Sequence, residues 1–170
     1  FNNPRNTIDV NTAGVVNLLE AIRLYANKAR LLQYSTSELY GGVYDAPCNE
    51  TTPFCPHSPY AISKLAAHWL VINYRESYKL WACCSIFFNY ESPRRGLNFV
   101  TRKATRAAAE IKLGIRDKVG FGNIDTYRDW GFASDYMQGA RLILEQPQPE
   151  EFVLATGKTY CVRDMLQIVF

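Results

Sequence analysis

The apolar segment WACCSIFF (residues 81–88) constrains the fold most, because it is nearly continuous rather than alternating. A strand that is apolar on both faces is typical of a parallel sheet with helices on both sides. Residues 10–26 have the spacing of an amphipathic helix, ARLLQYS (residues 29–35) follows as a short strand, and a second helix is expected over residues 59–78. Helix, strand, helix, strand in this order predicts a parallel sheet with crossover helices, which binds ligands at the carboxyl ends of its strands.

The later part of the chain continues this mixed pattern. We expect a basic helix near residues 98–113, a short strand at VGFG (residues 119–122), a loop at NIDTYRDWG (residues 123–131), a helix near 133–146, a strand at EFVLAT (residues 151–156) and a final helix.

Composition excludes several classes of protein. The net charge of +3 comes from 19 basic and 16 acidic side chains spread along the chain, so no basic tract indicates a nucleic-acid or membrane partner. Five cysteines without a CxxC pair favour reduced thiols and a cytoplasmic location. No apolar run approaches the roughly 18 residues that a membrane span requires. His57 and His68 lack ligand partners at useful spacing, so we expect no metal site.

The first candidate site is the segment QYSTSELYGG (residues 33–42), where an apolar strand ends in hydroxyls and a carboxylate. Such groups are costly to bury without partners, which suggests a polar cleft. Thr36 and Glu38 are two residues apart and would point into one cleft if the backbone stays extended. The alternatives are a solvated strand end and a helix N-cap.

The second candidate is the pair Tyr60 and Lys64, four residues apart on the helix expected over 59–78. They share one helix face, and an ammonium beside a phenol favours the phenolate, which can take a proton from a substrate hydroxyl. Taken alone, the pair also fits an exposed helix face.

A strand ending in Ser or Thr, a loop and then YxxxK resembles the extended short-chain dehydrogenase/reductase superfamily. The motifs STSELYG, ETTPF, SPYAISK, ESPRRG, NFVTRK and RDWG are similar, in order, to those of the GDP-mannose 4,6-dehydratase family. This resemblance implies an α/β fold with a partial Rossmann-type parallel sheet and part of a smaller C-terminal substrate-binding domain. It implies that residues 1–96 belong to the NAD(P)-binding Rossmann domain and residues 97–170 to the sugar-nucleotide-binding region, with 151–156 as a further sheet strand.

The resemblance also implies a reaction. GDP-mannose would be dehydrated to GDP-4-keto-6-deoxymannose by internal hydride transfer through NADP, with NAD left open. Tyr60 would remove the proton of the C4 hydroxyl, Thr36 would hold that hydroxyl, and Lys64 would support the phenolate. Glu38 would act as base at C5 and as acid for the departing C6 hydroxyl. A homodimer or homotetramer is expected.

Binding residues follow from the same resemblance. Cofactor contacts are expected at Tyr60, Lys64, Tyr90 and Arg95, and substrate contacts at Ser37, Asn89, Asn98, Val100, Lys103 and Arg128. The alternatives are a solvated helix face for Lys103, an ion pair with Asp129 for Arg128, and an ordinary basic loop for Arg95.

Some features depart from the family pattern. Tyr90 stands where the family has His, and Asn6 stands where it has Tyr. A glycine-rich G-x-x-G-x-x-G turn for the pyrophosphate is absent from the sequence, so we expect part of a longer enzyme and poor solubility of the chain alone. Another nucleotide-sugar dehydratase or epimerase, or an inactive sugar-nucleotide-binding remnant, remain the alternatives.

Overall fold

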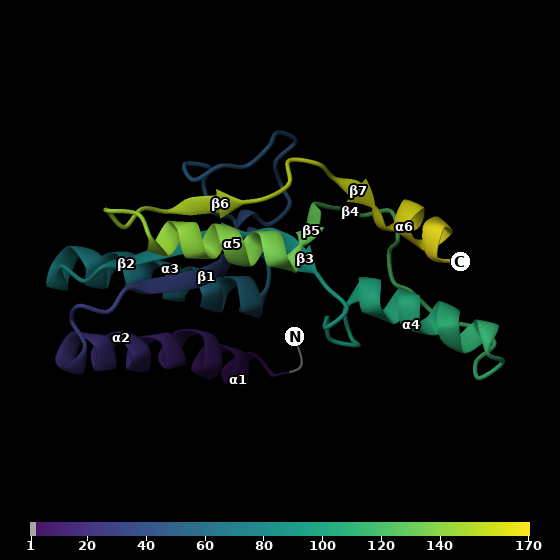
Figure 1. Cartoon of the computed structure of the whole chain (residues 1–170), viewed down its shortest axis with the longest axis horizontal. Helices are drawn as coiled ribbons and strands as arrows, with labels where there is room; N and C mark the ends of the chain where they lie inside the picture. Colours follow the sequence, from purple (N-terminus) through teal and green to yellow (C-terminus); the bar gives the residue numbers. More distant parts are fainter. Residues whose placement is uncertain (1–2) are drawn as a thin grey trace. The chain divides into compact units, whose positions relative to one another are not determined.

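The computed structural model, which describes residues 3–170, contains the expected parallel sheet (Figure 1). Its strands are β1 (Leu31–Thr36), β2 (Ala82–Phe87) and β6 (Phe152–Leu154), in the order β1-β2-β6 with both pairs parallel. Every residue of β2 is buried, as its continuous apolar pattern predicts. The chain therefore has an α/β fold with part of a Rossmann-type sheet.

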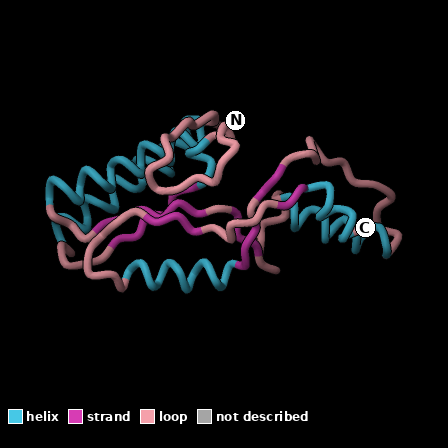
Figure 2. The backbone as a smooth tube through the Cα atoms, turned by 90° about the horizontal axis from the view of Figure 1, so that it is seen from above, coloured by secondary structure: helices cyan, strands magenta, loops and turns pink. Residues whose placement is uncertain are grey.

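Helices cover both faces of this sheet (Figure 2). On one face lie α2 (Gly14–Tyr25) and α3 (Pro59–Tyr78), which bury a core of apolar side chains with β2. That core comprises Leu19, Ile22, Val71, Leu80, Ala82 and Cys84. On the other face lies α5 (Ala133–Leu144), whose Tyr136 ring centroid is 6.0 Å from that of Phe87.

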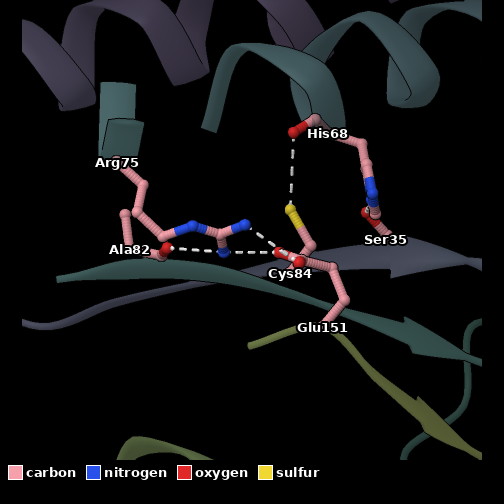
Figure 3. A network of polar contacts seen from close by, with 6 residues as sticks. All are labelled: Ser35, His68, Arg75, Ala82, Cys84 and Glu151. Atoms are coloured by element: carbon pink, nitrogen blue, oxygen red, sulfur yellow. Dashed lines mark hydrogen bonds and ion pairs between the residues drawn. The ribbon is translucent and has the colours of Figure 1, made fainter. Parts of the chain in front are cut away.

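Polar contacts join α3 to β1, to β2 and to the residue that precedes β6 (Figure 3). Arg75 forms a bidentate ion pair with Glu151 at 2.6 and 3.0 Å and donates to the carbonyl of Ala82 at 3.2 Å. Ser35 Oγ lies 2.9 Å from Nδ1 of His68. These groups are largely buried and serve as one another's hydrogen-bond partners. They therefore fix the position of α3 on the sheet.

The chain folds as two compact units. The first comprises residues up to Phe88 together with Tyr136–Leu154, and the second comprises Asn89–Asp135 and Ala155–Phe170. These two units are distinguished by how tightly their residues pack. The expected ranges 1–96 and 97–170 were distinguished by the ligand that each would bind, so this assignment of ligands to ranges stays a prediction.

The second unit contains two helices and two small sheets. Its main helices are α4 (Val100–Lys112) and α6 (Val162–Val169). β3 (Asn89–Glu91) pairs in parallel with β5 (Trp130–Phe132), and β4 (Tyr127–Arg128) pairs antiparallel with β7 (Tyr160–Cys161). The prediction of a strand at VGFG is wrong, because residues 119–122 are irregular. Strands form instead within NIDTYRDWG (residues 123–131), the segment expected to be a loop. Two glycines leave VGFG little side-chain surface to pack in a sheet.

The helix expected over residues 10–26 is interrupted. α1 (Pro4–Ile8) and α2 flank a π-helical turn, η1 (Asp9–Ala13). Asn6, where the family has Tyr, lies in α1 and donates its backbone N–H to Asn3 Oδ1 at 3.1 Å. No helix among residues 3–170 is long and apolar enough to cross a membrane.

Candidate functional site

The end of β1 changes direction at Thr36. Residues Ser37–Tyr40 form a 3₁₀ helix, η2, and Thr36 Oγ1 accepts the backbone N–H of Glu38 at 3.3 Å. The expectation of an extended backbone from Thr36 to Glu38 is therefore wrong, and Thr36 is a helix N-cap. The hydroxyl caps the turn because the first N–H groups of a helix lack partners within it. Glu38 is exposed to solvent, whereas Ser37 is half-buried.

The loop before α3 is attached to η2. Cys55 donates its backbone N–H to the carbonyl of Leu39 at 2.7 Å. η2 is followed by its C-cap Gly41, whose φ of 69° is left-handed and at which an added Cβ would overlap the carbonyl oxygen of Cys55. This close approach requires glycine. It fixes where the chain that leads to Tyr60 passes η2.

α3 begins at Pro59, the residue before Tyr60. Ser58 Oγ accepts the N–H of Ala61 at 3.0 Å, and Pro59 occupies the first helical position, both favoured at a helix start. Tyr60 is 44% exposed and therefore reachable from solvent, whereas Lys64, one turn later, is half-buried and burial lowers its pKa.

α3 packs against both β1 and η2, so Thr36, Glu38, Tyr60 and Lys64 lie on adjoining elements of the first unit. The set offers a hydroxyl, a carboxylate, a phenol and an ammonium at the carboxyl end of a parallel strand. Such groups are suited to moving protons on and off a substrate. A cavity of about 470 Å³ in the same unit is lined by other residues, including Glu50, and is separate from this set.

Two residues of the π-helical turn also contact α3, and the sequence analysis missed them. Asn11 Nδ2 donates to Ser63 Oγ at 3.1 Å, and Thr12 Oγ1 donates to the Ser63 carbonyl at 2.9 Å. Ser63 immediately precedes Lys64, so η1 supports the turn of α3 that carries the lysine. The signal in the sequence is the pair of polar residues within an otherwise helical apolar pattern.

The second unit contains a smaller cavity of about 170 Å³, to which two of the expected substrate residues, Val100 and Arg128, contribute. Its lining comprises Val100, Phe121, Gly122, Asn123, Ile124, Thr126, Arg128 and Val162. Arg128 donates to the Tyr127 carbonyl at 2.7 Å. Lys103 donates to the Gly120 carbonyl at 2.6 Å and lies 5.0 Å from the ring centroid of Phe121. Lys103 is thus held beside the wall of the cavity.

The expected cofactor residues of the second unit are neighbours. Arg95 lies 3.2 Å from Glu91 through Nε, 3.6 Å from the ring centroid of Phe99 and 6.0 Å from that of Tyr90. Asn89 and Tyr90 lie in β3, and Asn98 is exposed in the turn before α4. Arg95 is therefore fixed by an ion pair and aromatic stacking, while the ligand contacts of these residues stay predictions.

A parallel sheet layered between helices, with Tyr and Lys one turn apart beside the end of its first strand, defines a Rossmann-type protein of the short-chain dehydrogenase/reductase class. Within that class, the family model described as GDP-mannose 4,6 dehydratase matches residues 1–170. The chain belongs to the GDP-mannose 4,6-dehydratase family.

Individual relatives agree with this assignment. A GDP-mannose 4,6-dehydratase of Yersinia enterocolitica is 52% identical over 170 residues, which cover 99% of this chain and 46% of that protein. The Homo sapiens GDP-mannose 4,6 dehydratase is 48% identical over 166 residues, covering 96% of this chain and 45% of that protein. The chain thus spans less than half the length of these relatives.

Solved structures share the fold. The protein RMD from Pseudomonas aeruginosa, solved as a complex with NADPH, has a TM-score of 0.92 at 26% identity, covering 99% of this chain and 58% of that one. A dTDP-glucose 4,6-dehydratase from Bacillus anthracis, solved with NAD, has a TM-score of 0.86 at 24% identity, covering 95% of this chain and 51% of that one.

Proposed function

We propose that the native protein dehydrates GDP-mannose to GDP-4-keto-6-deoxymannose. The observation that carries the proposal is family membership along the whole chain together with an intact Thr36, Glu38, Tyr60 and Lys64. The reaction is a lyase reaction without net redox change, because the hydride removed from C4 of the sugar is returned at C6.

NADP is the cofactor we propose, with NAD as the alternative, and when bound it supplies the acceptor and donor of that hydride. Two features of the first unit fit a dinucleotide: the carboxyl ends of parallel strands, where such ligands bind, and the exposed phenol of Tyr60 at the start of α3. Tyr60, Lys64, Tyr90 and Arg95 would contact it. The NADPH complex of the P. aeruginosa protein supports this choice.

In the proposed mechanism, Tyr60 accepts the proton of the C4 hydroxyl while Thr36 holds that hydroxyl by a hydrogen bond. The ammonium of Lys64 stabilises the phenolate. The 4-ketone then acidifies the hydrogen at C5, which Glu38 removes. Glu38 returns a proton to the C6 hydroxyl, which leaves as water. The solvent exposure of Glu38 allows a sugar to reach its carboxylate.

The nucleoside diphosphate requires cationic donors, and the planar guanidinium of Arg128 is suited to phosphate. We assign the cavity bearing Val100 and Arg128 to this part of the substrate, with Lys103 beside it. Ser37, Asn89 and Asn98 complete the proposed substrate contacts. The native protein is proposed to be a cytoplasmic homodimer or homotetramer.

The test is turnover of GDP-mannose by the native protein with NADP, with loss of water detected by mass spectrometry of the sugar nucleotide. UDP- and dTDP-sugars should give no product, whereas a sibling dehydratase or an epimerase would convert one of them. An inactive remnant would convert none of the sugars.

Tyr60→Phe should lower turnover at least about 100-fold, because it removes the group that accepts the C4 proton. Tyr25→Phe is the matched control, since Tyr25 is 86% exposed at the end of α2 and should leave turnover unchanged. Full activity of Tyr60→Phe would rule out the mechanism.

A further inference from the structure

Asp129 is a buried carboxylate at a junction between two sheets. It is the single residue between β4, which ends at Arg128, and β5, which begins at Trp130. β4 pairs with β7 and β5 pairs with β3, so the chain changes sheets at this residue. Asp129 is only 5% exposed, and a buried carboxylate is costly unless it is fully hydrogen-bonded.

Three donors from a distant turn satisfy that carboxylate. Thr156 donates its N–H at 3.1 and 2.9 Å to the two carboxylate oxygens and its hydroxyl to Oδ1 at 2.9 Å. Gly157 donates its N–H to Oδ2 at 2.8 Å. Gly157 has a left-handed φ of 76°, which glycine adopts without strain and which lets its N–H point to the carboxylate beside that of Thr156. Hydrogen bonds to an ionised acceptor are among the stronger ones in proteins.

The Thr156–Gly157 turn lies two residues before β7, the strand that pairs with Arg128. Thr156 and Gly157 precede β7, and the register pairs Arg128 with Tyr160. Two further backbone hydrogen bonds extend the pairing of β4 with β7. They run from Val162 N–H to the Thr126 carbonyl at 2.9 Å and from Arg163 N–H to the Ile124 carbonyl at 3.0 Å. The cavity of the second unit is lined by Thr126, Arg128 and Val162, among others. The paired segments that contain β4 and β7 therefore form part of its wall.

We infer that Asp129 is a positioning residue for substrate binding: by bonding the Thr156–Gly157 turn, it fixes the register of β4 on β7 and thereby holds Arg128 at the cavity. Asp129 itself contacts no substrate, since its carboxylate is occupied by the turn. The inference rests on the proposed function, in which Arg128 binds the diphosphate.

The main test is Asp129→Asn in the native protein. Asn keeps one oxygen, which the N–H groups of Thr156 and Gly157 can share, but it replaces the second acceptor with an NH2 group, so the bond from the Thr156 hydroxyl and the negative charge are both lost. KM for GDP-mannose and the Kd for GDP should both rise about tenfold or more, the effect of losing a charge-assisted hydrogen bond. kcat and the Kd for NADP should change less than about threefold, because neither the catalytic set nor the cofactor contacts are altered.

Two substitutions at Thr156 test whether the rise in KM follows the loss of a hydrogen-bond donor to Asp129. Thr156→Val removes one of the three donors and should raise KM several-fold, whereas Thr156→Ser keeps the hydroxyl and should restore the native KM. Glu110→Gln controls for stability, because Glu110 holds Arg106 at 2.7 Å and Arg116 at 3.1 Å in the same unit, apart from the cavity lining. It should lower the melting temperature without moving KM.

Unchanged KM and GDP affinity in Asp129→Asn would overturn the inference while leaving the proposed function intact. Parallel loss of kcat, of NADP binding and of melting temperature would also overturn it, because that is the pattern of a merely structural residue. If the native protein binds GDP without converting GDP-mannose, weaker GDP binding by Asp129→Asn still supports positioning although the dehydratase proposal fails. If it neither binds nor converts, both proposals fail.

Discussion

His68 is a titratable side chain in the interior of the first unit, only 2% exposed. Burial lowers its pKa, and the nearby Arg75 guanidinium adds to this effect, while the Glu151 carboxylate opposes it. Ser35 lies against Nδ1, and the ring of Phe54 meets the imidazole edge-on. The neutral imidazole is therefore the form that the folded protein stabilises.

The lowered pKa of His68 sets the direction in which stability changes with pH. Below the ordinary histidine pKa of about 6.5, the unfolded chain binds a proton at His68 that the folded chain resists. The free energy of unfolding should therefore fall as the pH is lowered from about 7.5 to 5.5, and His68 should contribute at most about 1.4 kcal/mol per pH unit to this fall. Above that range, His68 should make no pH-dependent contribution to stability.

His68→Asn should flatten this part of the curve even if it lowers stability overall, as followed by chemical denaturation at several pH values. The exposed His57 provides the control, and His57→Gln should leave the slope unchanged. An unaltered slope in His68→Asn would show that the proton is bound elsewhere.

Individual site residues were predictable where a local motif marks them. Tyr60 and Lys64 are marked by their helical spacing, and the structure places both on the first two turns of α3. Asp129 and Asn11 were not predictable as contact residues, because their partners lie 27 and 52 residues away in the sequence. A buried carboxylate and a solvated one look alike until the segment that supplies its donors is known.

At the scale of elements, long periodic segments were predicted well. The start of α3 at Pro59 follows from Ser58 and Pro59, and the all-buried β2 follows from its continuous apolar run. η2 has four residues, and β4 and β7 have two each, which is too short for any period to show. These short elements carry Glu38 and Arg128, so the sequence indicated the residue types of the site without its local geometry.

Gly41 and Gly42 offer a paired test of the turn after η2. Both have left-handed φ values, 69° and 68°, but only at Gly41 would a Cβ meet the Cys55 carbonyl, whereas nothing lies within 4 Å of a Cβ at Gly42. Gly42→Ala should cost about 1–2 kcal/mol from backbone strain alone. Gly41→Ala should cost about 2 kcal/mol more through steric overlap, as measured by chemical denaturation. Equal losses would mean that the two backbone segments are not in contact.

At the scale of the whole molecule, the two edges of the described sheet differ. At the β6 edge, Glu50 accepts the N–H of Val153 at 2.8 Å, which satisfies a backbone donor. β1 pairs only with β2 within the described sheet, and helices α2 and α3 expose apolar side chains such as Leu18 and Trp69. Unpaired strand edges and apolar faces favour association.

The polypeptide of residues 1–170 made on its own should therefore self-associate or unfold over a broad temperature range. Analytical ultracentrifugation and calorimetry would measure this. A monodisperse monomer with a sharp, cooperative melt would contradict it.

The chain passes between its two compact units three times, after Phe88, after Asp135 and after Leu154. Neither unit is a contiguous stretch of sequence, so a single genetic crossover cannot exchange one without breaking the other. If the nucleoside diphosphate binds at Arg128 as proposed, exchanging this binding region between relatives would require replacing residues 89–135 and 155–170 together, with crossovers at all three junctions. Laboratory chimaeras should be designed at those same three positions.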